Sequence, residues 1–330
     1  MIVILSFQWL FHMFWGCNSL ASVIIPESVT SIGAWAFASS DTLTSLSIPR
    51  RYTLADIFTA TYTKITSVAI ADGVTHIGAS MFSGCNSLTS VTIPESVISI
   101  GSDAFSDCCS LTSIAIPSSV KIIGSGAFWD CDKLQGVYIS NLTAWCEIDF
   151  CGDKSNPLAY AHRLYLNGRE LTDLTIPDDV TCINDWAFYR CKNLTSVTMS
   201  DSVMRIGEYA FESSGLKSIA MSSSLTNIGD YAFEYCSSLE SVVIPGSVRN
   251  IGTRSFYECR GLKSATLPEG IIAIGSAAFS GCIELSAVTI PSSLTSINGV
   301  FSGCTALTSV MIPEGVTDIG GAFSGCSGLT

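Results

Sequence analysis

One sequence pattern recurs through almost the whole chain and constrains its fold more than any other feature. Residues 85–105 run C-x-x-L-x-x-V-x-I-P-x-x-V-x-x-I-G-x-x-x-F, and copies follow at intervals of 22 or 23 residues, apart from one interval of 37. Self-similarity at such a period indicates a solenoid, in which each coil packs on its neighbours and all coils share one core. We therefore expect one repeat domain over residues 1–330.

The pattern inside one copy predicts two walls of short strands. Val91 and Ile93 alternate with polar residues, which is typical of a strand with one buried face. Pro94 lacks a backbone N–H and should end that strand, and Ile100 supplies apolar surface on the opposite wall. Phe105 should anchor a single 3₁₀-like turn, because the segment around it is too short for an α-helix. The fold class expected is mainly β: a right-handed solenoid of about thirteen coils with a parallel sheet on one wall.

Composition and charge narrow the classes of partner. The chain has a formal net charge of −12 and no run of basic residues, so nucleic acid and anionic membrane surfaces are not expected partners. No segment carries the roughly 20 apolar residues that span a bilayer, so no membrane insertion is expected within this chain. Residues 1–16 are apolar but lack the basic flank and cleavage pattern of a clear signal peptide. Two interpretations of that segment stay open: a degenerate first coil or a truncated leader.

A longer string carries a family resemblance. Residues 88–108 run L-x-x-V-x-I-P-x-x-V-x-x-I-G-x-x-A-F-x-x-C, and residues 239–259 repeat it with Ser at the Ala position. This string resembles the BspA-like leucine-rich repeats. The resemblance implies a secreted or surface-displayed protein of the kind found in host-associated bacteria and some protozoa, often linked to adhesion. The partner it implies is a protein: a host or matrix protein, or another cell-surface protein.

We therefore expect a non-catalytic protein-recognition and adhesion array, either secreted or displayed at the cell surface. Two alternatives remain open: a passive spacer, and an accessory binding module of a larger secreted protein or enzyme. A binding array should carry an aromatic or charged cluster on one contiguous face, whereas a spacer should not. The chain stops just after Cys326, where the next strand should begin, so we expect it to be a fragment of a longer protein.

The interval of 37 residues marks an insert at residues 141–171, which supplies the first candidate binding site. Asn167 and Gly168 separate two strand-like runs and predict a β-hairpin, because Asn-Gly readily adopts a type I′ turn. The outward strand positions carry mostly Ser, Thr and Ala, and one aromatic residue that precedes the insert. The candidate binding residues are that aromatic and four aromatics of the insert: Tyr138, Trp145, Phe150, Tyr160 and Tyr165. The alternative is that these aromatics only pack the insert onto the solenoid.

A second candidate lies on the turns around the repeat Phe. Aromatic residues stand two positions before that Phe or one after it, namely Trp35, Trp186, Tyr209, Tyr231, Trp129, Tyr189 and Tyr257. Basic residues lie nearby, namely Arg190, Lys192, Arg205, Arg254 and Arg260. Acidic residues recur once per coil on the same turns, including Asp185, Glu208, Asp230 and Glu234, and we interpret them as a solvated face.

The fourteen cysteines favour burial over disulfides or metal. Ten share one phase of the repeat, namely Cys17, Cys85, Cys108, Cys131, Cys191, Cys236, Cys259, Cys282, Cys304 and Cys326. Coils about 4.8 Å apart would hold their Cβ atoms at nearly that spacing, which exceeds the roughly 3.8 Å typical of a disulfide. These cysteines should therefore be buried as small apolar groups. Only Cys146 and Cys151 are a candidate local disulfide.

Nothing in the sequence indicates an enzyme. No Gly-x-Ser-x-Gly motif and no glycine-rich phosphate loop are present, and the three histidines have unrelated surroundings. No close Cys/His ligand set suggests zinc. We therefore expect no catalytic residues, no metal and no cofactor.

Overall fold

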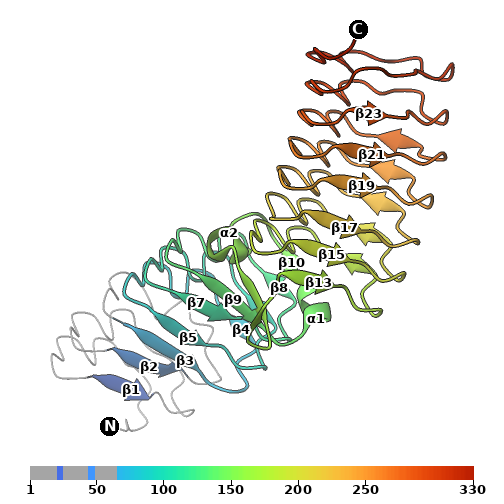
Figure 1. The fold of residues 1–330 in the computed structure, drawn as a ribbon. Helices are drawn as coiled ribbons and strands as arrows, with labels where there is room; N and C mark the ends of the chain where they lie inside the picture. The colour runs from blue at the N-terminus through green and yellow to red at the C-terminus, as the bar shows by residue number, and fades with distance from the viewer. Residues whose placement is uncertain (1–20, 25–43, 49–64) are drawn as a thin grey trace. The chain divides into compact units, whose positions relative to one another are not determined.

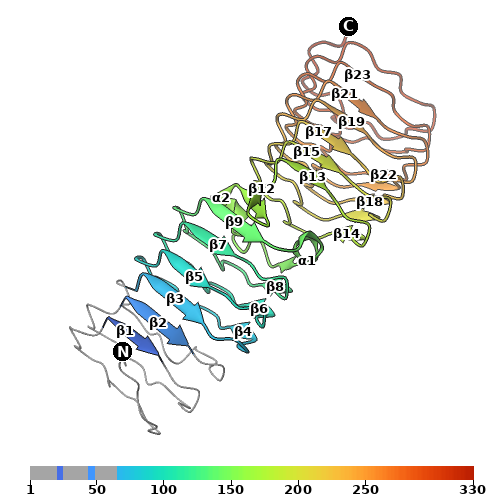
Figure 2. The ribbon, with the colours of Figure 1, turned by 60° about the horizontal axis from the view of Figure 1, so that its bottom comes forward.

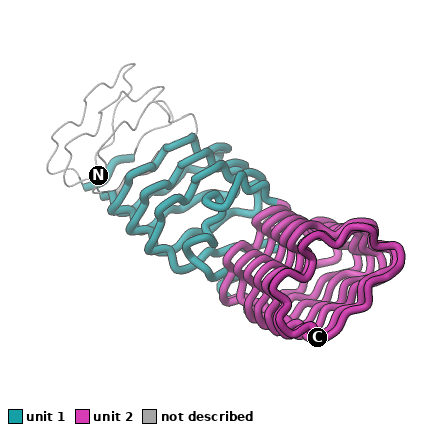
Figure 3. Tube along the Cα trace, turned by 90° about the horizontal axis from the view of Figure 1, so that it is seen from above, with its two compact units in different colours: residues 1–144, 148–169 teal, residues 145–147, 170–330 magenta. Residues whose placement is uncertain are grey.

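The computed structural model describes residues 21–24, 44–48 and 65–330. The chain divides into two compact units, Met1–Ala144 with Ile148–Arg169, and Trp145–Glu147 with Glu170–Thr330 (Figure 3). The predictions for residues 1–16, for Cys17 and for Trp35 fall outside the described residues. Each unit is a stack of coils, and the single array over the whole chain stays a prediction.

In the first unit, parallel strands form two walls (Figures 1 and 2). One wall holds β1 (Ser22–Ile24), β2 (Ser45–Ile48), β3 (Ser67–Ile70), β5 (Ser90–Thr92), β7 (Ser113–Ala115), β9 (Gly136–Ile139) and β11 (Leu164–Leu166), and the short strand β12 (Arg169–Glu170) pairs with β11 at the end of this wall. The other holds β4 (His76–Ile77), β6 (Ser99–Ile100), β8 (Ile122–Ile123) and β10 (Asp149–Phe150). Equivalent residues of successive coils pair, as Val68 pairs with Val91. This parallel register confirms the predicted mainly β solenoid.

The second unit repeats the two-wall arrangement. Its first wall consists of β13 (Asp173–Thr175), β15 (Ser196–Thr198), β17 (Ser218–Ala220), β19 (Ser241–Val243), β21 (Ser264–Thr266) and β23 (Ala287–Val288). The opposite wall consists of β14 (Cys182–Ile183), β16 (Arg205–Ile206), β18 (Asn227–Ile228), β20 (Asn250–Ile251) and β22 (Ala273–Ile274). The register is again parallel and one coil apart, as Val197 pairs with Ile219.

The core of each unit is built from rows of identical residues. Val91 is buried between exposed Ser90 and Thr92, as the alternation predicts. The repeat phenylalanines stack ring on ring, at 5.2 Å between Phe82 and Phe105 and at 4.9 Å between Phe256 and Phe279. Around each of them the chain makes a single turn closed by an i to i+3 bond, such as Cys108 N to Phe105 O at 3.2 Å.

The phased cysteines lie beside the phenylalanine row and are buried. The nine that the structure describes are between 0% and 8% exposed. Most donate their S–H to the carbonyl oxygen of the Phe one coil earlier, as Cys259 does to Phe233 at 3.1 Å and Cys282 does to Phe256 at 3.2 Å. The predicted buried cysteine ladder is therefore confirmed for these nine. A thiol suits the position because it is small, apolar and still a weak donor to a buried carbonyl.

Burial should make these thiols slow to react. It raises the pKa of Cys85 to about 12 and that of Cys236 to about 11, so little thiolate exists at neutral pH. Alkylation of the native protein at pH 8, followed by mass spectrometry, should modify exposed Cys151 first and the nine described phased cysteines only after denaturation. Equal rates for Cys151 and Cys259 would contradict the buried ladder.

Glycines after the second-wall strands set how closely the coils approach. A Cβ built on Gly229 would lie 2.6 Å from the carbonyl carbon of Gly207 and 2.7 Å from the backbone nitrogen of Glu208. Real Cβ atoms do not come that close to backbone, so the coil spacing there requires a residue without a side chain. Gly246 lies in the same unit on an open turn, and a Cβ there would meet nothing within 4 Å.

The insert forms the predicted hairpin and two short helices that the sequence analysis did not predict. Strands β11 and β12 flank Asn167 and Gly168, whose φ angles of 50° and 79° fit the type I′ turn. The second strand of the hairpin is β12 at Arg169–Glu170. The helices are α1 (Leu142–Cys146) and α2 (Leu158–Ala161).

Candidate functional site

Two of the five predicted binding residues lie together on the surface of the first unit. Tyr138 and Tyr165 come from neighbouring strands β9 and β11, and their rings stack at 4.6 Å between centroids. Tyr138 is 38% exposed and Tyr165 is half-buried. Gly136 makes room for the pair, because a Cβ there would lie 3.0 Å from the Tyr165 ring and 3.1 Å from the Tyr138 ring.

The other three predicted residues do not form a surface patch. Trp145 is 1% exposed and its indole N–H donates to the carbonyl oxygen of Ala187 at 2.9 Å. Phe150 is 3% exposed on β10. The prediction that Trp145 and Phe150 contact a partner is therefore wrong, because both are core side chains. Tyr160 is half-buried, and its hydroxyl oxygen accepts the backbone N–H of Asp130 at 3.0 Å.

The candidate disulfide is not formed in the structure. Cys146 is buried and Cys151 is exposed, and both are free thiols. Burial raises the pKa of both thiols, and Glu147 adds to the effect on Cys146 while Asp149 adds to that on Cys151. The described part of the chain contains no group of three or more His, Cys, Asp or Glu side chains that could hold a metal ion.

The turns of the second unit carry the stronger cluster of functional side chains. Two residues before each repeat Phe, the backbone is left-handed, with φ between 52° and 69° in every described coil that has this Phe. This left-handed row is Ser80, Asp103, Gly126, Trp186, Tyr209, Tyr231, Arg254, Ala277, Gly299 and Gly321. Such a backbone costs a residue with a Cβ about 1 kcal/mol relative to glycine. Large side chains occupy four successive positions of this row, from Trp186 to Arg254, although small residues such as Ala277 and Gly299 adopt the same backbone in later coils.

The aromatic members of this row form a stack. The Trp186 and Tyr209 rings lie 4.0 Å apart with an interplanar angle of 7°, and Tyr209 and Tyr231 lie 4.5 Å apart at 2°. Tyr189 packs edge-on against Trp186 at 5.0 Å. The three stacked side chains are half-buried, so part of each meets solvent while the stacked ring faces cover one another.

Arg254 continues the row with a planar guanidinium. Its guanidinium carbon lies 3.9 Å from the centroid of the Tyr257 ring and 5.7 Å from that of Tyr231. Its Nη2 also forms an ion pair with the buried carboxylate of Glu234 at 2.8 Å. Burial raises the pKa of Glu234, whereas Arg254 lowers it. The Arg254 guanidinium therefore contacts two aromatic rings and one carboxylate.

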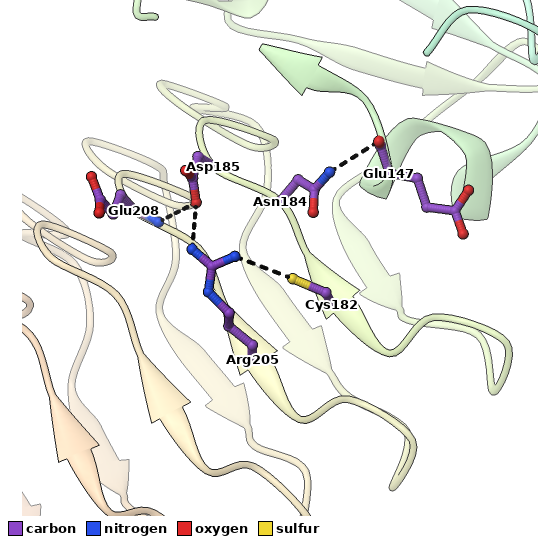
Figure 4. Close-up of polar contacts among 6 residues, drawn as sticks. All are labelled: Glu147, Cys182, Asn184, Asp185, Arg205 and Glu208. Atoms are coloured by element: carbon purple, nitrogen blue, oxygen red, sulfur yellow. Dashed lines mark hydrogen bonds and ion pairs between the residues drawn. The ribbon is translucent and has the colours of Figure 1, made fainter. Parts of the chain in front are cut away.

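An acidic residue stands directly before each aromatic residue of the row: Asp185, Glu208 and Asp230. Asp185 accepts hydrogen bonds from the Arg205 guanidinium at 3.1 Å and from the backbone N–H of Glu208 at 2.8 Å (Figure 4). The Glu208 carboxylate points away from Arg205 in the same view. Partial burial and the charges of Asp185 and Asp230 raise the pKa of Glu208. Burial raises the pKa of Tyr209 to about 12, and the neighbouring Tyr231, Glu212 and Glu234 add to the effect.

Two further contacts in Figure 4 tie the first turns of the second unit together. Arg205 Nη1 donates to Cys182 Sγ at 3.8 Å, and Asn184 Nδ2 donates to the carbonyl oxygen of Glu147 at 2.9 Å. Burial raises the pKa of Cys182, while Arg205 lowers it. These contacts join neighbouring segments just before the turns that carry the acidic and aromatic residues.

We call this cluster the turn-edge surface. Its members are Asp185, Trp186, Tyr189, Glu208, Tyr209, Asp230, Tyr231, Glu234, Arg254 and Tyr257. The next three coils of the unit have Ser, Asn and Gly at the acidic position, Ala and Gly in the left-handed row, and Ser after the Phe. The scaffold thus does not require the large and charged residues. The sequence alone indicates this region as a second candidate site and its acidic residues as a solvated face.

Comparison with known proteins places the repeat in a family. A family model described as "BspA type Leucine rich repeat region" matches in six copies, at residues 11–61, 55–151, 162–259 and 227–330. The chain belongs to the BspA-type leucine-rich repeat family. This confirms the resemblance carried by residues 88–108. Leucine-rich repeat proteins of this kind are non-catalytic and typically bind proteins.

Several solved structures are similar to this BspA-type chain. A leucine-rich repeat protein from Eubacterium ventriosum has a TM-score of 0.55 at 22% identity, with 86% of this chain and 88% of that chain covered. The leucine-rich repeat protein of T. pallidum is 34% identical over 48% of this chain and 78% of its own, with a TM-score of 0.47. A leucine rich cell surface protein from Faecalibacterium prausnitzii is 29% identical, covering 89% and 80%, with a TM-score of 0.46.

The E. ventriosum structure supports the shared fold. None of the curated proteins compared with the chain matches it. In the part of the chain that the structure describes, no helix is both long enough and apolar enough to cross a membrane.

Proposed function

We propose that the protein is a non-catalytic recognition and adhesion array, secreted or displayed at the cell surface, that binds a protein through the turn-edge surface. The observation that carries this proposal is the run of Trp186, Tyr209, Tyr231 and Arg254 at left-handed backbone positions where Ala277 and Gly299 suffice one and two coils later. Trp, Tyr and Arg are the residues enriched at the energetic centres of protein interfaces. Their placement at a conformational cost supports a role in binding.

The aromatic side chains of the turn-edge surface are also held in place before any partner binds. The stacked rings hold one another in place, so little side-chain entropy is lost when a partner packs against them. A passive spacer would need only the small residues of the coils that follow Arg254, which favours recognition over that alternative. The Tyr138 and Tyr165 pair on the first unit is our second proposed contact area, because its rings are also stacked and partly exposed.

The test is a double substitution, Tyr209→Ala with Tyr231→Ala. Alanine fits the left-handed row, since Ala277 already occupies it with φ of 56°. We expect binding of the labelled protein to host cells and immobilised host matrix proteins to fall about tenfold or more, as for loss of two interface anchors. Biolayer interferometry and flow cytometry would measure the change, and Tyr138→Ala should give a smaller loss.

The matched control is Ser276→Ala with Ser280→Ala, which alters the corresponding turn of the same unit where no aromatic stack exists. It should bind as the unchanged protein does. Unchanged binding by the Tyr209 and Tyr231 variant, with the same circular dichroism spectrum and melting temperature, would remove the turn-edge surface as the binding site.

A further inference from the structure

The acids of the turn-edge surface are only partly neutralised within the unit. Asp185 is paired with Arg205, and Glu234 with Arg254. Asp230 accepts the backbone N–H of Thr253 at 2.7 Å through one oxygen, which leaves its charge uncompensated by a cation. Among the described residues, none forms a hydrogen bond or ion pair with the Glu208 carboxylate, and Arg205 acts on it only at longer range. Glu208 and Asp230, which directly precede the stacked Tyr209 and Tyr231, therefore have no ion-pair partner among the described residues.

The stacking geometry limits which chemical groups can bind beside these carboxylates. Ring faces 4.0 and 4.5 Å apart cover one another, so no flat group can insert between them. Beside the stacked rings the surface offers phenol oxygens and carboxylate oxygens that accept hydrogen bonds. A group that carries several donors and a positive charge complements this set.

The chain itself contains an example of such recognition. Arg254 lies one coil beyond Tyr231 in the same row, against Tyr257 and in an ion pair with Glu234. Aromatic residues and carboxylates of this surface thus already hold one guanidinium at 3.9 Å from a ring and 2.8 Å from an oxygen. The planar guanidinium also carries five donors, so one arginine can bond to carboxylates from two adjacent coils, whose backbones lie about 4.8 Å apart.

Resting on the proposed recognition function, we propose that the turn-edge surface binds a basic segment of its protein partner, with an arginine of that segment placed between Glu208 and Asp230. The occupant is a cationic peptide segment because the site is acidic within a chain of net charge −12. The raised pKa of Glu208 agrees with this, because a cation beside it would relieve the repulsion from Asp185 and Asp230.

The experiment uses the full chain and three synthetic peptides of alternating Thr with arginine, lysine or citrulline. Citrulline keeps the shape of arginine without its charge. Isothermal titration calorimetry should show that the arginine peptide binds and that its affinity falls with added salt. The lysine peptide should bind more weakly than the arginine peptide, and the citrulline peptide should bind at least about tenfold more weakly than the arginine peptide.

The variant that tests the location is Glu208→Gln with Asp230→Asn. These changes remove two charges and keep the oxygen that accepts the Thr253 N–H. We expect about tenfold weaker binding of the arginine peptide. The matched control, Asp178→Asn with Glu314→Gln, removes two exposed charges elsewhere in the unit and should change the affinity less than about twofold.

The outcomes separate this inference from the proposed function. No binding of the arginine peptide, or equal binding by the Glu208 and Asp230 variant, would overturn the inference. So would a variant that loses the peptide but keeps full binding to cells. In each case the proposed function stands if Tyr209→Ala with Tyr231→Ala still lowers cell binding about tenfold or more, and it fails if that variant binds cells normally.

Discussion

Replacing Phe256 with alanine should lower the free energy of unfolding by about 3 to 5 kcal/mol. The Phe256 ring is 0% exposed and stacks on Phe233 at 5.1 Å and on Phe279 at 4.9 Å. Its removal deletes buried apolar surface and leaves a cavity between two coils that cannot close, because their backbones are fixed by ladder hydrogen bonds on both walls. Urea denaturation followed by far-ultraviolet circular dichroism would measure the change.

Phe256→Leu is the companion variant. Leucine keeps most of the buried apolar volume but loses both ring stacks, so the loss should be nearer 1 to 2 kcal/mol. The order of the two variants is the decisive result. If Phe256→Ala unfolds at the same urea concentration as the unchanged protein, the phenylalanine row does not hold the second unit together.

Replacing Gly229 with alanine should destabilise the protein by about 2 to 3 kcal/mol, although it adds a single methyl group. The new Cβ would lie 2.6 Å from the carbonyl carbon of Gly207, so the two coils would have to move apart. That movement would stretch the strand pairing of β16 with β18 and the Tyr209–Tyr231 stack at 4.5 Å. The urea midpoint should fall, and binding through the turn-edge surface should fall with it.

Gly246→Ala is the control for this effect. Nothing lies within 4 Å of its Cβ and its backbone is not left-handed, so alanine should be neutral or slightly stabilising there. Equal effects of Gly229→Ala and Gly246→Ala would show that the effect is one of chain flexibility and not of coil spacing.

The periodic part of the fold was predictable from sequence because each of its rows is determined by one residue type. Val91, Ile100 and Phe105 recur at one spacing, and a parallel register places each directly on its equivalents. The same logic located the buried thiols such as Cys259, because a ladder spacing is too long for a disulfide. Structural features that recur in every coil can therefore be predicted from the sequence pattern.

The insert was predicted less well because it occurs once. Helices α1 and α2 have five and four residues, too few for a periodic pattern. Local side-chain bonds support their starts: Asn141 Oδ1 accepts from Ala144 N, and Asn156 Oδ1 accepts from Leu158 N. The burial of Trp145 depends on Ala187, 42 residues away, and no local pattern encodes such a contact.

For the turn-edge surface, the sequence predicts which residues take part but not how they are arranged. Its aromatic and basic residues could be identified from their phase, but the left-handed backbone beneath Trp186 and Tyr209 could not, because large side chains disfavour that conformation. Their stacking, and the contacts of Arg254 with Tyr257 and Glu234, follow only once equivalent turns are known to lie on top of one another.

The left-handed row has a consequence for how such a protein can change over generations. Its backbone is the same under Trp186, Ala277 and Gly299, so the side chain at each step can vary while the coil beneath it stays folded. Gain or loss of one whole coil would lengthen or shorten the row without shifting its register. New recognition surfaces can therefore arise when single coils are duplicated and the residue at the left-handed position is substituted, while the fold stays the same.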